Sequence, residues 1–188
     1  MNETLLPVRA VTYEGPPDLL LRFRSVKMFL CDVDGILTDG GVYMGVDPEM
    51  KRFDVRDGFG LKLMQEQDIK VGWVSHRPSE ATRKRSEDLG IDFLHQAKGN
   101  KVDAIEQMLA REGLSWDDVC YMGDDIVDLG ALRRARMSAT VPGALKEVRL
   151  EAHYITRNLA GRGAVREVAE LILRSQNKWQ PLLDEHSI

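Results

Sequence analysis

Between residues 26 and 156, short apolar runs alternate with longer stretches in which apolar residues recur at helical spacing. The apolar runs predict strands over Val26–Cys31, Val71–Val74, Phe93–Leu94, Val119–Met122, Ser138–Val141 and Tyr154–Thr156. The other stretches predict helices over Gly58–Gln67, Ser79–Leu89, Lys101–Glu112, Ile126–Ala135 and Ala164–Asn177. Strands that alternate with helices in this way are typical of βαβ units. The pattern therefore predicts an α/β fold, a doubly wound Rossmann-like parallel sheet with helices on both faces.

One segment interrupts this alternation, between the first strand and the first helix. Two runs with apolar residues, Gly41–Met44 and Met50–Val55, flank the turn-forming sequence Gly45–Glu49. This arrangement predicts a small β-hairpin inserted over about residues 41–55. The first helix should follow it, with Asp57 as a possible N-cap.

The length of 188 residues leaves room for one well-buried core, since a domain takes roughly 100–200 residues. Residues 1–25 contain three prolines and no clean period, so we interpret them as an N-terminal extension. The domain should span residues 26–175, and residues 176–188 should form a C-terminal tail. Only the hairpin and this tail remain to cover a site, so we expect no cap domain.

Composition narrows the class of protein further. A hydrophobic fraction of 43% and a charged fraction of 30% are ordinary for a soluble protein. The formal net charge of −4 argues against nonspecific binding of nucleic acid or of a membrane surface. No window approaches the roughly 20 apolar residues of a membrane helix, and the chain start lacks a signal-peptide pattern, so we expect a cytoplasmic protein. Cys31 and Cys120 lie in apolar runs and should be buried thiols.

The first predicted strand runs directly into two carboxylates, Asp32 and Asp34. Positions i and i+2 of an extended segment face the same side, so these side chains should converge, and Gly35 permits a turn away. Ligands bind at the carboxyl ends of strands in open parallel sheets. Taken alone, the two acids could equally cap a turn.

A second acidic cluster follows a later strand, where Asp124 and Asp125 come directly after it and Asp128 lies one helical turn further on. Carboxylates from two strand ends can bind a hard cation, and Mg²⁺ prefers one or two carboxylates together with water and phosphate oxygens. Asp125 is also a candidate N-cap of the next helix. Two acidic strand ends in one small domain nevertheless favour a metal site.

Two further loops offer groups that bind anions. Ser75 and Arg77 follow a predicted strand and precede a helix, where backbone N–H groups, a hydroxyl and a guanidinium can meet a phosphate. Lys101 enters the next helix. A single lysine is usually a solvated charge, but its place in the chain between Ser75 and the second acidic cluster makes it a candidate for neutralising phosphate.

The order Asp32-x-Asp34-Gly-x-x-Thr38, Ser75, Lys101 and Gly-Asp124-Asp125-x-x-Asp128 resembles the four motifs of the haloacid dehalogenase superfamily of phosphatases. A longer resemblance, to the family of 3-deoxy-D-manno-octulosonate 8-phosphate (KDO 8-phosphate) phosphatases, covers nearly everything after the N-terminal extension. It is carried by Thr38–Gly40, the hairpin with Tyr43, Phe53–Gly60, Thr156–Arg157 and Gly161–Glu167.

The superfamily resemblance implies a Mg²⁺-dependent phosphoric monoester hydrolase. It assigns Asp32 as the nucleophile that forms an aspartyl-phosphate and Asp34 as the general acid and base. Ser75 and Lys101 would hold the transferring phosphoryl oxygens. The implied Mg²⁺ ligands are Asp32, the backbone carbonyl of Asp34 and Asp124, with Asp125 and Asp128 in support.

The closer resemblance implies hydrolysis of KDO 8-phosphate in lipopolysaccharide precursor synthesis, by a homotetramer whose inserted hairpins form a shared assembly. The candidate substrate-binding residues are Thr38, Arg56, Arg77 and Arg162. Each arginine taken alone could equally be a surface residue. His76 stands where we would expect glycine in this family, and a side chain there would narrow the pocket.

Two other hypotheses compete with this one. The same chemistry could act on a nine-carbon ulosonate 9-phosphate or another acid-sugar phosphate. A phospho-receiver domain, or a non-catalytic regulatory domain on this fold, also combines paired acids, a hydroxyl and a lysine. In a receiver the phosphorylated aspartate ends the third strand, whereas here the Asp-x-Asp pair ends the first, which favours the phosphatase.

Overall fold

A computed structural model describes residues 17–43, 45 and 49–187 of the chain. These residues contain a six-stranded parallel sheet in the order β3-β2-β1-β4-β5-β6. Its strands are β1 (Met28–Cys31), β2 (Lys70–Ser75), β3 (Phe93–Gln96), β4 (Val119–Met122), β5 (Met137–Thr140) and β6 (Tyr154–Ile155). All six predicted strands are present, with small shifts at their ends. The prediction of a doubly wound parallel sheet is confirmed.

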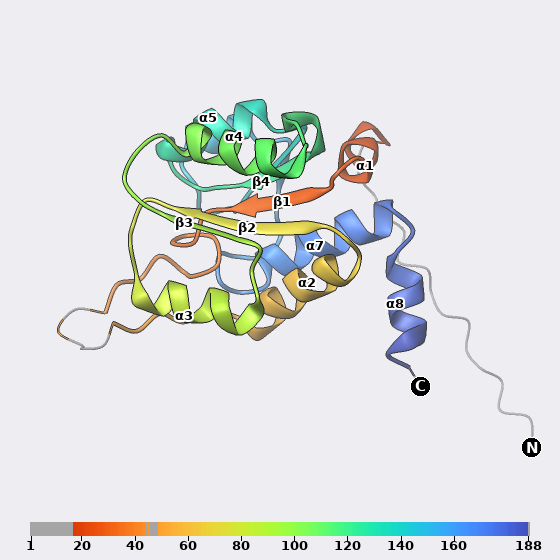
Figure 1. The fold of residues 1–188 in the computed structure, drawn as a ribbon, viewed down its shortest axis with the longest axis horizontal. Helices are drawn as coiled ribbons and strands as arrows, with labels where there is room; N and C mark the ends of the chain where they lie inside the picture. The colour runs from red at the N-terminus through yellow and green to blue at the C-terminus, as the bar shows by residue number, and fades with distance from the viewer. Residues whose placement is uncertain (1–16, 44, 46–48, 188) are drawn as a thin grey trace, which may run out of the picture.

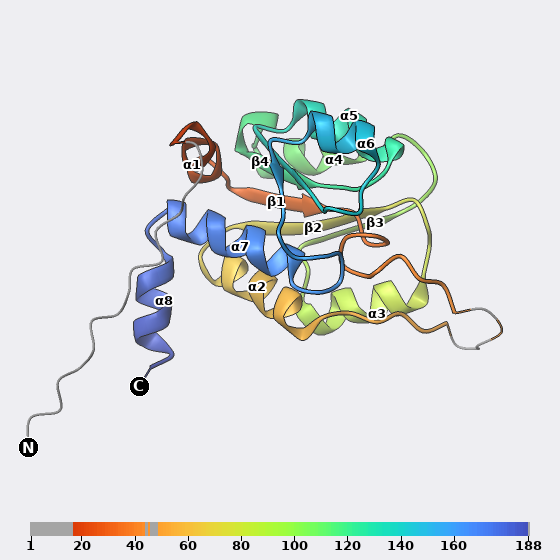
Figure 2. The ribbon, with the colours of Figure 1, turned by 180° about the vertical axis from the view of Figure 1, so that it is seen from behind.

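Helices cover both faces of the sheet (Figure 1). One layer consists of α4 (Lys101–Glu112), α5 (Leu129–Arg134) and α6 (Lys146–Glu151), and the other of α2 (Val55–Glu66), α3 (Glu80–Leu89) and α7 (Ala164–Ser175), as Figure 2 shows from behind. The predicted ends of α3 and α4 are confirmed. Gly90 and Gly113 end them in the left-handed conformation, with φ of 62° and 66°. None of the helices in the described ranges is long and apolar enough to cross a bilayer.

Helix α2 begins three residues earlier than predicted. Its N-cap is Asp54, whose carboxylate accepts a hydrogen bond from the backbone N–H of Arg56. The prediction of Asp57 as this N-cap is wrong, because Asp57 serves another helix. Its carboxylate accepts from Gly163 N at 3.2 Å and Arg166 N at 2.8 Å, at the start of α7. Glycine at the N-cap of α7 has no side chain to do this.

The predicted β-hairpin differs from the structure. The described residues of the insertion, 41–43, 45 and 49–54, form no strand and follow an irregular path near α3 (Figures 1 and 2). Residues 44 and 46–48 of the predicted hairpin lie outside the described part of the chain. An isolated two-stranded hairpin is marginal in water, and the described residues of the insertion do not pair with the sheet. We refer to residues 41–54 as the flap loop.

Short helices at both ends of the chain pack on the core. Helix α1 (Pro17–Arg24) buries Phe23 against Tyr154, with ring centroids 6.1 Å apart. Helix α8 (Trp179–Glu185) buries Trp179 beside α7, where the guanidinium of Arg174 lies 4.8 Å from its ring. Both segments are too short for apolar residues to show a helical spacing in the sequence. Residues 17–24 and 179–185 therefore add to the core, while residues 1–16 lie outside the described ranges.

Both cysteines are free and buried, as predicted. Burial raises the pKa of the Cys31 and Cys120 thiols above the ordinary value. A thiol held in its neutral form is a weak nucleophile, so neither cysteine is a candidate for covalent chemistry.

Candidate active site

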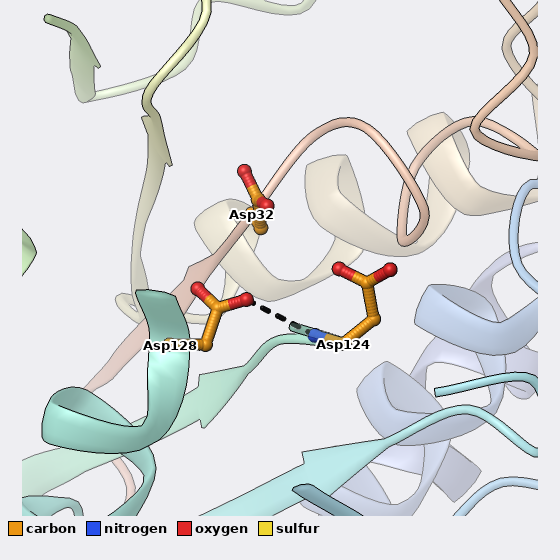
Figure 3. A group of neighbouring side chains, drawn as sticks. All are labelled: Asp32, Asp124 and Asp128. Carbon is orange, nitrogen blue, oxygen red and sulfur yellow. Dashed lines mark hydrogen bonds between the residues drawn. The ribbon is translucent and has the colours of Figure 1, made fainter. Parts of the chain in front are cut away.

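Three of the predicted acids, Asp32, Asp124 and Asp128, meet where the direction of the sheet's winding changes. The chain runs from β1 outward to β3, then returns to β4 beside β1 and runs outward to β6. Asp32 follows β1 and Asp124 follows β4, so both stand at the carboxyl ends of neighbouring strands (Figure 3). This switch point is where open α/β sheets bind ligands.

Three carboxylates form a compact cluster at this point. Asp32, Asp124 and Asp128 each offer an oxygen, and these oxygens lie within 4.8 Å of one another. Two glycines leave the space they need. A Cβ on Gly35 would lie 2.1 Å from Oδ2 of Asp124, and one on Gly123 would lie 2.4 Å from Cγ of Asp128. Gly35 also has a φ of 87°, which L side chains rarely adopt.

Asp128 is fully buried, and its two oxygens are occupied by donors. Oδ1 accepts from the Tyr121 hydroxyl at 2.5 Å and from Nζ of Lys101 at 2.7 Å. Oδ2 accepts from the backbone N–H groups of Asp124 at 3.1 Å and Asp125 at 3.2 Å (Figure 3 shows the first). Asp128 thus fixes the main chain that carries Asp124. The same contacts split the predicted helix Ile126–Ala135 into a 3₁₀ turn, Ile126–Asp128, followed by α5.

Lys101 links the two acidic motifs. Its side chain is 1% exposed, and Nζ lies 2.7 Å from Oδ1 of Asp128 and 3.2 Å from Oδ1 of Asp32. Burial alone would lower the pKa of Lys101, but the two carboxylates outweigh burial and raise it. The lysine therefore remains charged at the centre of the site, as its predicted role requires.

Two carboxylates remain poorly compensated. Burial raises the pKa of Asp32 to about 6, with Lys101 opposing the rise. Burial, followed by repulsion from Asp128 and Asp32, raises the pKa of Asp124 to about 7. Among the described residues, no donor bonds the Asp124 side chain or Oδ2 of Asp32. Carboxylate oxygens that have no donor at such a site fit a divalent cation, so Oδ2 of Asp32 and the carboxylate of Asp124 are suited to hold Mg²⁺.

Magnesium should stabilise the protein more at about pH 7.5 than at about pH 5.5. The folded-state pKa values of Asp32 and Asp124 exceed the ordinary value, so stability without metal falls as pH rises toward about 7. Below that range protons compete with the ion, and the apparent affinity for Mg²⁺ should fall by at least about tenfold. Thermal melts with and without Mg²⁺ at both pH values test this. An equal Mg²⁺-dependent gain in Tm at both pH values would contradict this prediction. So would a gain in Asp124→Asn as large as that of the wild type.

The structure also brings Ser75 and Thr38 to this edge of the sheet. Ser75 ends β2 with 2% exposure, and its hydroxyl accepts from Arg77 N at 3.1 Å, which shapes the loop before α3. Thr38 is buried, and its hydroxyl lies 3.5 Å from Oδ1 of Asp34. Asp125 is the N-cap of the 3₁₀ turn, where its carboxylate accepts from Ile126 N at 2.6 Å. The prediction of an N-cap role for Asp125 is confirmed.

The three candidate substrate arginines differ in their surroundings. Arg77 pairs with Glu49 of the flap loop at 2.6 Å. Arg56 pairs with Asp54 at 3.0 Å and donates to the backbone carbonyl of Arg162 at 3.3 Å. Arg77 and Arg56 are thus both paired with carboxylates of this chain, while Arg162 is exposed beside Arg56.

Lys51 is a site residue that the sequence analysis missed. Its side chain is 3% exposed, and Nζ lies 2.7 Å from Oδ1 and 2.9 Å from Oδ2 of Asp34. No sequence pattern marks a single lysine in a loop as a site residue. The contact between Lys51 and Asp34 depends on the path of the flap loop.

The fold and the acid cluster together define a hydrolase of the haloacid dehalogenase-like class, and residues 75–168 match that family. Two curated relatives narrow the class. The 3-deoxy-D-manno-octulosonate 8-phosphate phosphatase of Yersinia pestis is 38% identical over 172 residues, which cover 90% of this chain and 92% of the relative. The enzyme of the same name from Escherichia coli strain K12 is 36% identical over 170 residues, 89% of this chain and 90% of the relative.

A solved structure of the same family is also similar to this chain. The crystal structure of the Moraxella catarrhalis phosphatase of that name, in complex with magnesium, phosphate and KDO, is 34% identical. It matches with a TM-score of 0.87 over 90% of this chain and 98% of its own. The chain belongs to the family of 3-deoxy-D-manno-octulosonate 8-phosphate phosphatases.

Proposed function

We propose that this protein hydrolyses KDO 8-phosphate to KDO and inorganic phosphate in a Mg²⁺-dependent reaction, as a step of lipopolysaccharide precursor synthesis. The observation that carries the proposal is the convergence of Asp32, Asp124 and Lys101 at the switch point of the sheet, in a chain that resembles phosphatases of that name over nine-tenths of its length. We also propose a cytoplasmic location, which the two free, buried cysteines fit.

In the first step, Oδ2 of Asp32 attacks phosphorus. A bond forms between this oxygen and phosphorus, the bond from phosphorus to the sugar oxygen breaks, and protonated Asp34 gives its proton to that oxygen. Oδ2 is suited to the attack because Val33 N and Lys101 both bond the other oxygen, Oδ1. Lys101 and Ser75 hold phosphoryl oxygens, where the positive charge of the lysine and the O–H donor of the serine stabilise the developing negative charge.

In the second step, Asp34 takes a proton from water. The water oxygen bonds to phosphorus, the aspartyl oxygen leaves, and Asp32 returns as a carboxylate. When bound by Asp32, Asp124 and the backbone carbonyl of Asp34, Mg²⁺ offsets the repulsion between the carboxylate and the phosphate dianion. Asp128 positions Lys101 and the main chain of Asp124. Asp125 caps the 3₁₀ turn that leads to Asp128.

Arg77 is the strongest of the proposed residues for the sugar's carboxylate. It follows the Ser75 loop, and its guanidinium already binds a carboxylate, that of Glu49, at 2.6 Å. Thr38, beside Asp34, would contact the leaving end of the sugar. Arg56 and Arg162 lie together at the starts of α2 and α7 and would contact a more distant part of the substrate.

A panel of phosphate esters in excess Mg²⁺ tests the substrate. We expect kcat/KM for KDO 8-phosphate to exceed that for simple aldose phosphates by about 100-fold, because a site built around a carboxylate partner discriminates against sugars that lack one. Arg77→Ala should lower that ratio, and Arg133→Ala, which removes an exposed arginine paired with Glu151, should not. A flat profile would refute the proposal, and a preference for a nine-carbon ulosonate 9-phosphate would reassign the substrate.

We further propose a homotetramer. Among its described residues, the flap loop exposes the apolar side chains of Val42, Tyr43 and Met50, which are 50%, 52% and 54% accessible in a single chain. These residues pair with no strand of the sheet. Contact between flap loops of several copies would bury them. Light scattering should give four times the 21.2 kDa of one chain. A monomer at working concentration would contradict this.

A further inference from the structure

Asp34 is held mainly by Lys51. Both oxygens of Asp34 lie within hydrogen-bond distance of the Lys51 ammonium, at 2.7 and 2.9 Å. Among the described residues, the other side-chain bond to Asp34 comes from Thr38 at 3.5 Å, the long limit for such a bond. A lysine side chain that is only 3% exposed is unusual unless it is paired, and here the pairing is with the acid that the proposed reaction uses twice.

The flap loop around Lys51 is anchored at three points. Glu49 pairs with Arg77 at 2.6 Å. Arg52 donates to the backbone carbonyl of Gly161 at 2.9 Å. Phe53 stacks on Trp73 of β2, with centroids 6.1 Å apart and ring planes 11° apart. These contacts flank Lys51 on both sides, so the position of its ammonium is set by three separate parts of the fold.

We propose that Lys51 is the positioning residue for Asp34, an inference that rests on the proposed function. Each acid of the Asp-x-Asp pair then has its own lysine. Lys101, from α4, holds Asp32 at 3.2 Å, and Lys51, from the flap loop, holds Asp34. Two separate cations direct the two carboxylates to separate tasks, attack on phosphorus for Asp32 and proton transfer for Asp34.

The role is one of orientation, and Lys51 exchanges no proton. In the first step, the proton passes from Asp34 to the sugar oxygen, and the N–H groups of Lys51 bond the carboxylate that remains. In the second step, Asp34 takes its proton from water, and Lys51 stays an ammonium throughout. General acid and base catalysis contributes about 10²–10⁴-fold and requires the proton-transfer geometry to be held within about 0.5 Å.

Leaving groups of different basicity separate this role from a structural one. With KDO 8-phosphate, Lys51→Met should lower kcat about 10–100-fold while KM changes less than about threefold. p-Nitrophenolate leaves without a proton, so with p-nitrophenyl phosphate the first step should persist and the second should slow. Lys51→Met should then show a burst of about one p-nitrophenolate per site and accumulate phosphoenzyme. Lys51→Arg should restore part of kcat.

Lys27→Met is the matched control. Lys27 also pairs with an aspartate, Asp118, at 2.8 Å, but lies before β1 at the opposite end of the sheet and is 64% exposed. Lys27→Met should leave the hydrolysis of KDO 8-phosphate and of p-nitrophenyl phosphate unchanged. Wild-type kcat in Lys51→Met would overturn the proposal, as would an equal loss on both substrates without a burst, provided that thermal melting shows a folded protein. If the wild type hydrolyses p-nitrophenyl phosphate but not KDO 8-phosphate, the substrate assignment fails while the burst still tests Lys51.

Discussion

Asp32→Asn is expected to lower the rate of phosphate release by at least about 10⁴-fold, because it removes the nucleophile. An amide oxygen is a far weaker nucleophile than a carboxylate of the same shape. The remaining contacts survive the change, since the asparagine oxygen can still accept from Val33 N at the position of Oδ1. Lys101 keeps its closer partner, Asp128, at 2.7 Å. Steady-state assays of phosphate release measure the loss.

The same substitution should leave the fold intact. Burial raises the pKa of Asp32 to about 6, so the ionised carboxylate opposes folding at neutral pH, and a neutral amide removes that cost. We therefore expect Tm in metal-free buffer to stay the same or rise. Asp117→Asn, on an exposed turn before β4, is the control and should retain full activity. Undiminished turnover in Asp32→Asn, with its identity verified by intact mass, would disprove the nucleophile assignment.

The sheet and the acid cluster could be predicted from the sequence because both depend on local patterns. Buried parallel strands read as short apolar runs, and carboxylates that directly follow such runs must lie at the strand ends. Helix ends followed from caps within a few residues, as at Gly90 and Gly113. These features need no knowledge of how distant segments pack.

The features that the sequence did not reveal depend on distant contacts. Asp57 looks like a local N-cap, yet it binds N–H groups more than a hundred residues away at the start of α7. Lys51 contacts Asp34 only because of the path that the flap loop takes in the folded chain. The flap loop looks like a hairpin because its residues alternate, but a strand needs a partner, and none lies within the described part of this chain.

Lys101→Met should damage both stability and activity. The substitution removes the only cation that contacts Asp32 and Asp128 among the described residues, and Asp128 is fully buried. Breaking a buried ion pair by removing one partner costs about 3–5 kcal/mol in the free energy of unfolding, because the other charge remains without compensation. Loss of a positive charge beside the transferring phosphoryl group should also lower kcat by about 10³-fold. Urea unfolding and phosphate-release assays measure the two effects.

The stability loss in Lys101→Met should depend on pH in a defined direction. Lys101 opposes the rise in the pKa of Asp32, so its removal raises that pKa further and favours the protonated acid in the folded state. A protonated carboxyl tolerates burial, so the loss should be smaller at about pH 5.5 than at about pH 8. Lys27→Met, which removes an exposed partner of Asp118, should cost less than about 1 kcal/mol at either pH. An equally small loss in Lys101→Met would mean that Asp128 is stabilised by Tyr121 and the backbone N–H groups alone, and that Lys101 acts only on the substrate.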